Sequence, residues 1–178
     1  MSAGAVQSKR PEAWGWFLGL ALLTFAVFAP SIGFDYVDLD DPQYVFANPR
    51  VVSGLNAENV RWAFTHAHES WWLPALWISY MADATLLGKE PWGFHLVNVL
   101  LHAANALLLF GVLRRATGAT RTSAFAAALF AIHPLRVESV AWITERKDVL
   151  SGLFWMLALA THLRQAEKRL PLKRFAAP

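Results

Sequence analysis

The sequence has no cysteine and few charged residues. With 0 Cys among 178 residues, disulfides and thiolate metal sites are excluded, and any metal would need oxygen or imidazole ligands. Charged residues make up 16% of the chain and hydrophobic residues 56%, with a mean hydropathy of +0.33. Water solvates such an apolar surface poorly, so we expect a membrane protein.

The sequence also shows no internal repeat and no low-complexity tract. Its formal net charge of +3 could suggest a nucleic-acid partner. The basic residues, however, lie at the ends of apolar runs rather than on one polar face, so we expect no nucleic acid. Nine tryptophans lie mostly beside these runs, which is typical of side chains at a membrane interface.

Four apolar runs predict an all-α, multi-pass transmembrane bundle of about four spanning helices. The runs are 13–30, 92–113, 122–135 and 149–163. The third and fourth are shorter than the roughly 20 residues that a bilayer requires, so flanking residues must contribute. A secretory signal peptide would resemble the first run, but no convincing small-x-small cleavage site precedes Asp35, which favours an uncleaved anchor.

If these four runs span the membrane, the basic and acidic residues separate between its two sides. Tails 1–12 and 164–178 and the turn 114–121 together hold 10 Lys/Arg and 2 acids, whereas segments 31–91 and 136–148 hold 6 Lys/Arg and 11 acids. Basic residues remain on the cytoplasmic side, so both termini are expected there, with 31–91 as an external loop and 136–148 as an external turn.

The long segment 31–91 is too charged to cross lipid, and we expect a structured loop that carries interfacial helices. Within it, 71–88 is apolar enough either to span or to lie along the interface. Pro74, Ser79, Asp83 and three tryptophans favour the interfacial arrangement.

Asp40 and Asp41 are adjacent acids shortly after the first apolar run, followed by Pro42 and Tyr44. An Asp-Asp-Pro sequence commonly forms a turn or a helix cap. Near a membrane surface the same pair could instead act as a general base or bind a divalent metal, Mg²⁺ or Mn²⁺, the only cofactor that the residues suggest.

Four polar residues form one stripe on the second apolar run: His95, Asn98, His102 and Asn105, spaced +3, +4 and +3. Polar side chains avoid lipid, so the stripe must face protein or a cavity. Two interpretations remain open. Either the stripe joins neighbouring helices by hydrogen bonds, or it forms the wall of a binding site near the outer surface, which would involve His95 more than the deeper residues.

Mixed charges gather between the third and fourth runs. They comprise His133, Arg136, Glu138, Glu145, Arg146, Lys147 and Asp148. They could pair with one another in a salt-bridged re-entry turn, or bind a charged ligand. In the second case Arg146 and Lys147 are the expected phosphate binders.

Several motifs occur in order along the chain. They are Asp40-Asp41 with Tyr44 and Asn48-Pro49; 62–65 (WAFT); 91–98 (PWGFHLVN); 101–103 (LHA); and 133–142 (HPLRVESVAW) with 145–148 (ERKD). The series, which covers about 34 to 163, resembles the amino-terminal membrane part of bacterial tetratricopeptide-repeat membrane proteins. These are related to the transmembrane and tetratricopeptide-repeat O-mannosyltransferases.

The resemblance implies a C-type (GT-C) glycosyltransferase fold in the bacterial inner membrane. Such an enzyme moves a sugar from a polyprenyl-phosphate donor to a protein or glycan acceptor on the extracytoplasmic side. Asp40 and Asp41 match the acidic pair of its first loop, one of them a catalytic base or metal ligand. The second motif is matched by His133, Glu138, Arg146 and Asp148, with Arg146 facing the lipid phosphate.

With these matches, the predicted catalytic residues are Asp40, Asp41 and Glu138. The predicted substrate-binding residues are Tyr44, His95, His133, Arg136, Arg146, Lys147 and Asp148, and Asn98, His102 and Asn105 are predicted to be structural. Such enzymes have about twice as many spanning helices, followed by repeats that are absent here, so we expect a fragment that is inactive alone. A transporter or a non-catalytic sugar-lipid-binding subunit is the alternative.

Overall fold

The computed structural model describes residues 11–169, which form helices joined by turns and contain no strand. The longer helices are α1 (Pro11–Phe28), α4 (Pro74–Leu86), α5 (Pro91–Thr117), α6 (Thr120–Ile132) and α8 (Arg146–Arg169). The shorter ones are a 3₁₀ helix η1 (Ala29–Gly33), a π-helical turn η2 (Pro42–Phe46), α2 (Pro49–Val52), α3 (Ala57–Thr65) and α7 (Arg136–Ala141).

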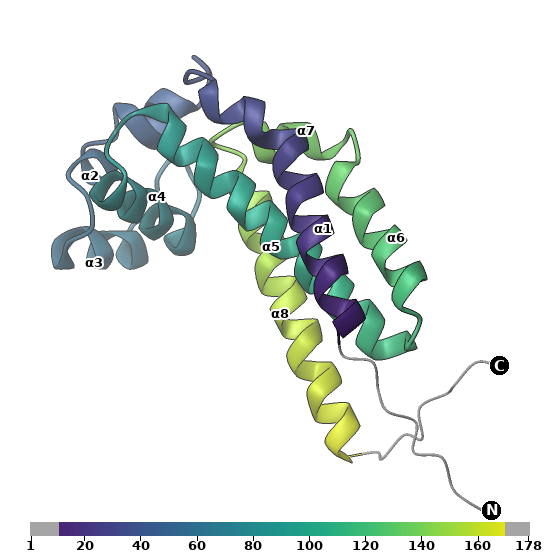
Figure 1. Cartoon of the computed structure of the whole chain (residues 1–178). Helices are drawn as coiled ribbons and strands as arrows, with labels where there is room; N and C mark the ends of the chain where they lie inside the picture. Colours follow the sequence, from purple (N-terminus) through teal and green to yellow (C-terminus); the bar gives the residue numbers. More distant parts are fainter. Residues whose placement is uncertain (1–10, 170–178) are drawn as a thin grey trace, which may run out of the picture.

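Helices α1, α5, α6 and α8 form a bundle, and α5 packs against the other three (Figure 1). The start of α1, the α5–α6 turn and the end of α8 lie at one end of the bundle. A lobe of short helices, η2 and α2 to α4, lies at the other end beside the start of α5. The arrangement separates the acidic loop from the basic helix ends along the length of the bundle.

Two helical stretches are long and apolar enough to cross a membrane, Ala13–Gly33 and Pro91–Thr117. Large apolar side chains face outward along the first of them, including Trp14, which is 77% exposed. Helix α6 has 13 residues, about 20 Å at 1.5 Å per residue, which is less than the ~30 Å of a bilayer core. Two spanning helices are therefore supported, and the four-span topology stays a prediction.

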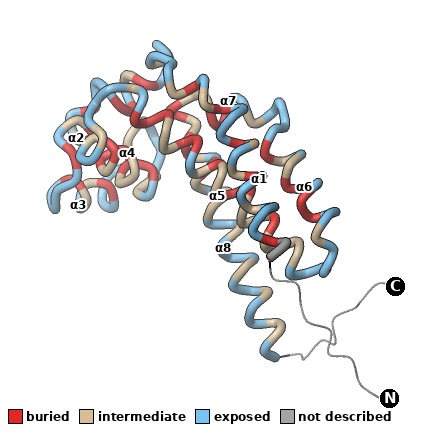
Figure 2. Tube along the Cα trace, viewed as in Figure 1, coloured by how far each residue is buried: buried red, intermediate tan, exposed pale blue. Residues whose placement is uncertain are grey.

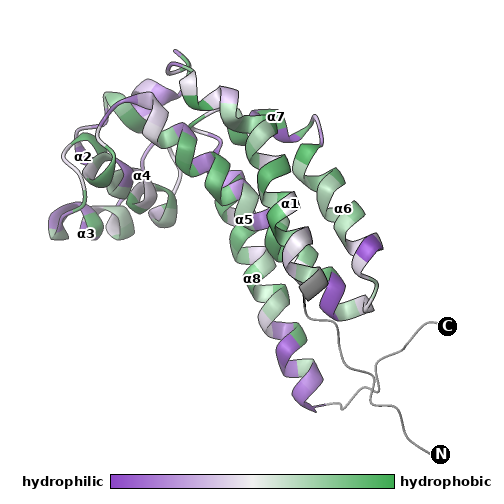
Figure 3. Cartoon of the chain, viewed as in Figure 1, coloured by the Kyte–Doolittle hydropathy of each residue, from purple (hydrophilic) through white to green (hydrophobic). Residues whose placement is uncertain are grey.

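Helix α8 is longer than the apolar run that predicted it. It begins at Arg146, within the segment expected to be an external turn, and continues to Arg169. Asp148 lies in its first turn and Lys168 and Arg169 in its last, where their charges complement the helix dipole. The outer surface of α8 is exposed over most of its length and becomes polar at its end (Figures 2 and 3).

The basic end of the bundle is joined by one ion pair. Arg115 near the end of α5 donates from Nε to both carboxylate oxygens of Glu167 on α8, at 2.8 and 2.9 Å. These contacts hold the ends of α5 and α8 together on the side away from the lobe.

The lobe has its own core, which includes Tyr44, Val45, Trp77, Tyr80 and Met81. Helix α4 supplies most of these side chains and packs against α2 and α3. With 13 residues it is too short to span a bilayer by itself, which favours the interfacial alternative for 71–88.

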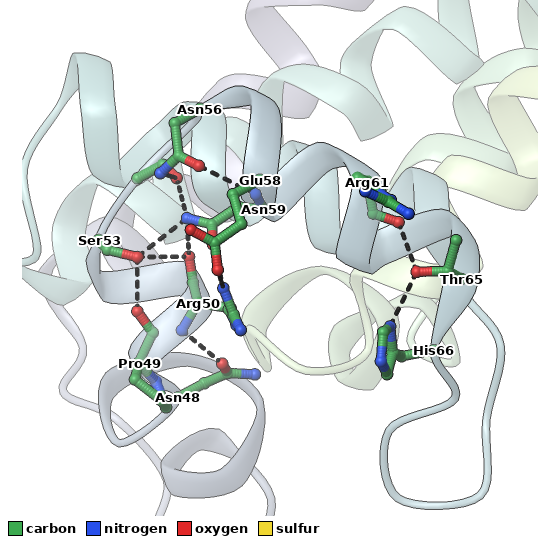
Figure 4. Close-up of polar contacts among 11 residues, drawn as sticks. Asn48, Pro49, Arg50, Ser53, Asn56, Glu58, Asn59, Arg61, Thr65 and His66 are labelled. Atoms are coloured by element: carbon green, nitrogen blue, oxygen red, sulfur yellow. Dashed lines mark hydrogen bonds and ion pairs between the residues drawn. The ribbon is translucent and has the colours of Figure 1, made fainter.

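Asparagines fix the turns between η2, α2 and α3 (Figure 4). The Asn48 side chain accepts a hydrogen bond from Arg50 N and caps α2, and Pro49 occupies the first helical position. Asn56 caps α3 in the same way. Buried Asn59 donates to the Arg50 and Gly54 carbonyls and to Ser53. The Asn-Pro motif therefore has a structural explanation.

Candidate active site

The two adjacent acids occupy different environments. Asp41 is 0% exposed, and its Oδ2 accepts a hydrogen bond from Val37 N at 2.8 Å. Its Oδ1 accepts from the backbone N and the hydroxyl of Thr144, which lies 103 residues later in the turn before α8. Asp41 thus fastens the first loop to the start of α8, and both its oxygens are used by the protein.

Asp40 is exposed and lines a pocket of about 400 Å³. The other lining residues are Gln43, Tyr44, Glu69, Trp71, Leu73 and Lys147. They come from η2, from the segment before α4 and from the first turn of α8. The pocket therefore forms where the first loop meets the second charged motif. A cavity of about 520 Å³ at the other end of the bundle, beside Trp16 and Arg121, includes none of the predicted site residues.

Two of the predicted substrate-binding residues share this pocket with Asp40. Lys147 is partly exposed, and its Nζ lies 2.6 Å from Glu145 Oε1. Burial raises the pKa of Tyr44, opposed by Lys147 and assisted by Asp40, so the phenol keeps its proton at neutral pH. The pocket thus offers a carboxylate, an ammonium group and a neutral hydroxyl.

Arg146 lies elsewhere than predicted. It is 0% exposed and forms an ion pair with Asp83 of α4. Its Nε donates to Asn98 Oδ1 at 2.6 Å and its Nη2 to the Phe94 carbonyl at 2.8 Å. The guanidinium also lies 4.6 Å from the ring centroid of Tyr80. Arg146 thus joins α4, α5 and α8, and its predicted contact with a lipid phosphate stays a prediction that these buried contacts do not support.

Asp83 is ionised in this ion pair at neutral pH. Burial raises its pKa to about 6, and the Arg146 guanidinium limits the rise. The carboxylate is charged above that pH, so the ion pair between α4 and α8 is formed in the physiological range.

The polar stripe of α5 is buried between helices. Asn98 donates to the Trp142 carbonyl at 3.2 Å and Asn105 to the Val149 carbonyl at 2.8 Å, and His102 Nε2 lies 2.9 Å from the Ala131 carbonyl. These are the contacts of the first interpretation, in which the stripe joins neighbouring helices.

His95 is 1% exposed and packs edge-on against Phe34, with ring centroids 6.3 Å apart. The chain after η1 covers His95, so its predicted contact with a substrate stays a prediction that this burial does not support.

The remaining residues of the second motif lie outside the pocket. His133 Nδ1 accepts from Leu135 N at 3.3 Å, and Arg136 lies over the Phe130 ring at 4.6 Å. Asp148 accepts from the Ser139 hydroxyl at 2.9 Å. Glu138 is exposed on α7. The structure therefore brings Asp40, Tyr44 and Lys147 together, but not His133, Arg136, Glu138 or Asp148.

The pair Asp40 and Asp41 does not provide two free carboxylates for Mg²⁺ or Mn²⁺, since Asp41 is occupied by protein donors. Within residues 11–169, no group of three His, Asp or Glu side chains is placed to hold a metal ion. The described donor set does not fit a protein-held divalent cation.

Four further residues line the pocket that were not predicted as site residues: Gln43, Glu69, Trp71 and Leu73. Glu69 and Trp71 lie more than 25 residues from the acidic pair along the chain. Trp71 was attributed to the membrane interface. It reaches the pocket because the turn that contains it is joined to η2 by the contact between His68 and the Gln43 carbonyl.

Comparisons with known proteins agree on one family. The family model described as dolichyl-phosphate-mannose-protein mannosyltransferase matches residues 73–176. The protein O-mannosyl-transferase tmtc2 of Xenopus laevis is 36% identical over 107 residues, 59% of this chain and 13% of that protein. The Drosophila melanogaster proteins Tmtc2 and Tmtc1 are 29% and 30% identical over 83% and 85% of this chain. No solved structure matches.

The chain spans 13% to 18% of the length of these relatives. The two helices that are long and apolar enough to cross a membrane agree with a membrane protein. The family model covers more than half of the chain, including α4 to α8 and the buried Arg146. The chain belongs to the dolichyl-phosphate-mannose-protein mannosyltransferase family.

Proposed function

We propose that this chain is the amino-terminal part of a glycosyltransferase. The enzyme transfers a sugar from a polyprenyl-phosphate donor to a hydroxyl group of a protein or glycan on the extracytoplasmic side of a bacterial inner membrane. One observation carries the proposal: of the adjacent acids Asp40 and Asp41, only Asp40 lines the pocket, and Lys147 of the second motif lines the same pocket.

The proposed reaction is a single displacement. The acceptor oxygen forms a bond to the anomeric carbon while the bond from that carbon to the phosphate oxygen breaks, and the lipid phosphate leaves with the electron pair. Asp40 takes the proton of the acceptor hydroxyl. Lys147 is the basic residue left to stabilise the negative charge on the departing phosphate, because Arg146 is occupied.

Asp41 has a supporting role in this scheme. Its hydrogen bonds to Val37 and Thr144 hold the loop that presents Asp40 against the turn that presents Lys147. The base and the cation thereby line one pocket, and holding the reacting groups together in this way is what a displacement requires.

The alternative of a transporter is less well supported. A translocation path needs polar groups that line a cavity at mid-membrane depth. Three of the four stripe residues, Asn98, His102 and Asn105, instead contact backbone carbonyls of neighbouring segments. The exposed polar groups of the site lie at the lobe end of the bundle.

The test is sugar transfer by the full-length protein. We expect membranes that contain it to convert radiolabelled dolichyl phosphate mannose, the donor in the family's name, into protein-bound label that alkali releases. Membranes without the protein serve as the control, and the same test on the isolated chain 1–178 is expected to show no transfer. Equal labelling with and without the full-length protein would exclude this donor reaction.

The proposed sidedness makes a separate prediction. Because the sequence has no cysteine, single cysteines at exposed Ala47 in the lobe and exposed Gln165 near the end of α8 can be labelled selectively. A membrane-impermeant maleimide should label Ala47→Cys from outside and Gln165→Cys only after the membrane is opened. If both cysteines react in the same compartment, the extracytoplasmic site is wrong.

A further inference from the structure

A tight turn contributes Glu69 and Trp71 to the wall of the pocket. His68 and Trp71 exchange backbone hydrogen bonds of 3.0 and 2.9 Å, and Glu69 and Ser70 between them have φ of 49° and 65°. Two consecutive non-glycine residues in the left-handed region are unfavourable, and such backbone persists where the surroundings enforce it, often at a ligand site.

The lobe core holds this turn in place. His68 Nε2 lies 3.0 Å from the Gln43 carbonyl in η2. The imidazole packs edge-on against Trp77, with ring centroids 5.2 Å apart, and against Tyr44 at 6.2 Å. The turn is therefore tied to the same η2 segment that follows Asp40.

The turn places Trp71 at the pocket with its ring largely free. Trp71 is 61% exposed and lines the pocket together with Asp40, Glu69 and Lys147. The next residue, Trp72, is 59% exposed, but its Nε1 donates to the Phe64 carbonyl at 3.0 Å and it does not line the pocket. Two adjacent tryptophans with nearly equal exposure thus differ in whether they face the pocket.

The chemistry of the pocket suits an uncharged polyol. An indole provides a large, rigid apolar face at low entropic cost, while a hexose ring has an apolar face of C–H groups and a rim of hydroxyls. The carboxylates of Asp40 and Glu69 can accept from those hydroxyls. The lining holds these two carboxylates and one ammonium group, Lys147, so it can accept from several hydroxyls and still place a positive charge beside the phosphate to which the sugar is linked.

We propose that the exposed ring face of Trp71 is the platform on which the pyranose ring of the transferred sugar stacks, with Glu69 accepting from its hydroxyls. The inference rests on the proposed function and adds a residue that recognises the sugar. It places the sugar ring beside Trp71 and Asp40, with the lipid phosphate to which the ring is linked beside Lys147.

The test compares two lipids that differ only by the sugar. The affinity of the full-length protein for dolichyl phosphate mannose and for dolichyl phosphate is measured in detergent, and the ratio of the two Kd values gives the contribution of the sugar. We expect Trp71→Ala to reduce this preference roughly fivefold to tenfold. Trp71→Phe, which keeps an aromatic face, should retain most of it, and Trp71→Leu, which keeps apolar volume only, should not.

Trp72→Ala is the matched control, since it removes an equally exposed indole outside the pocket and should leave the ratio unchanged. A ratio that Trp71→Ala and Trp71→Leu leave intact would overturn the inference alone. A wild-type protein that binds the two lipids equally would overturn both the inference and the proposed donor. Because Trp71 is mostly exposed, its replacement is not expected to prevent folding. If the Ala variant misfolds, the comparison of Trp71→Phe with Trp71→Leu tests the same inference.

Discussion

Replacing Asp40 with Asn in the full-length protein is expected to lower the rate of sugar transfer by about 10²- to 10⁴-fold, the usual contribution of a general base. The change removes the proton acceptor but keeps the size of the side chain. Because Asp40 is exposed at the pocket and no protein hydrogen bond to its carboxylate is described, the melting temperature should stay within experimental error of the wild type.

Asp41→Asn is the matched control, with the opposite profile. Both carboxylate oxygens of Asp41 accept hydrogen bonds, one from Val37 N and the other from Thr144. Asparagine replaces one of these oxygens by an NH₂ group, so one of the two buried donors loses its acceptor and faces another donor. Such a loss costs about 1–3 kcal/mol. We expect a lower melting temperature, with the transfer rate of the remaining folded protein reduced less than in Asp40→Asn.

Rates measured in proteoliposomes and melting curves measured in detergent distinguish the two variants. If Asp40→Asn transfers sugar at the wild-type rate while Asp41→Asn is folded and inactive, the base has been assigned to the wrong residue. If both variants are fully active, neither acid takes the proton.

The distinction between Asp40 and Asp41 shows what the sequence could not supply. Adjacency and the following Pro42 predicted an acidic turn near the membrane, and Asp40 and Asp41 do lie in such a turn. Which carboxylate is free depends on Thr144, 103 residues away. Local pattern contains no information about that contact.

The same limit separates Arg146 from Lys147. Both were predicted to bind phosphate, since each is a basic residue beside a membrane surface. On a helix, consecutive residues point about 100° apart, so one faces the lobe and α5 while the other faces the pocket. The start of α8 was not predicted, because the apolar run begins only at Val149. Without knowing where the helix begins, we could not predict in which directions Arg146 and Lys147 point around it.

By contrast, the helices that depend on hydrophobic length were predicted well. The run 92–113 lies within α5, and 13–30 overlaps the candidate span Ala13–Gly33, because an uninterrupted apolar run is a strong local signal. The spacing of Asn98, His102 and Asn105 also predicted correctly that they share one face, since all three are buried and paired with neighbouring backbone.

Replacing Arg146 with Met is expected to give the largest loss of stability. The Asp83 carboxylate would remain buried without its partner, Asn98 Oδ1 and the Phe94 carbonyl would lose their donors, and breaking a buried ion pair in this way costs about 3–5 kcal/mol. Lys147→Met is the matched control on the next residue. Its ion pair with Glu145 is partly exposed, so the loss should be at most about 1 kcal/mol.

A double variant separates the ion pair from the rest of the arginine. Asp83→Leu with Arg146→Met replaces both charges by apolar groups of similar size, and we expect it to recover most of the stability lost in Arg146→Met, because no buried charge is left uncompensated. Thermal unfolding of all four proteins in the same detergent measures the difference. If Arg146→Met melts at the same temperature as Lys147→Met, Arg146 does not hold α4, α5 and α8 together. Loss of that joint would also displace Thr144 and Lys147, its neighbours in the chain, so the position of Asp40 relative to Lys147 depends on an arginine that faces away from the pocket.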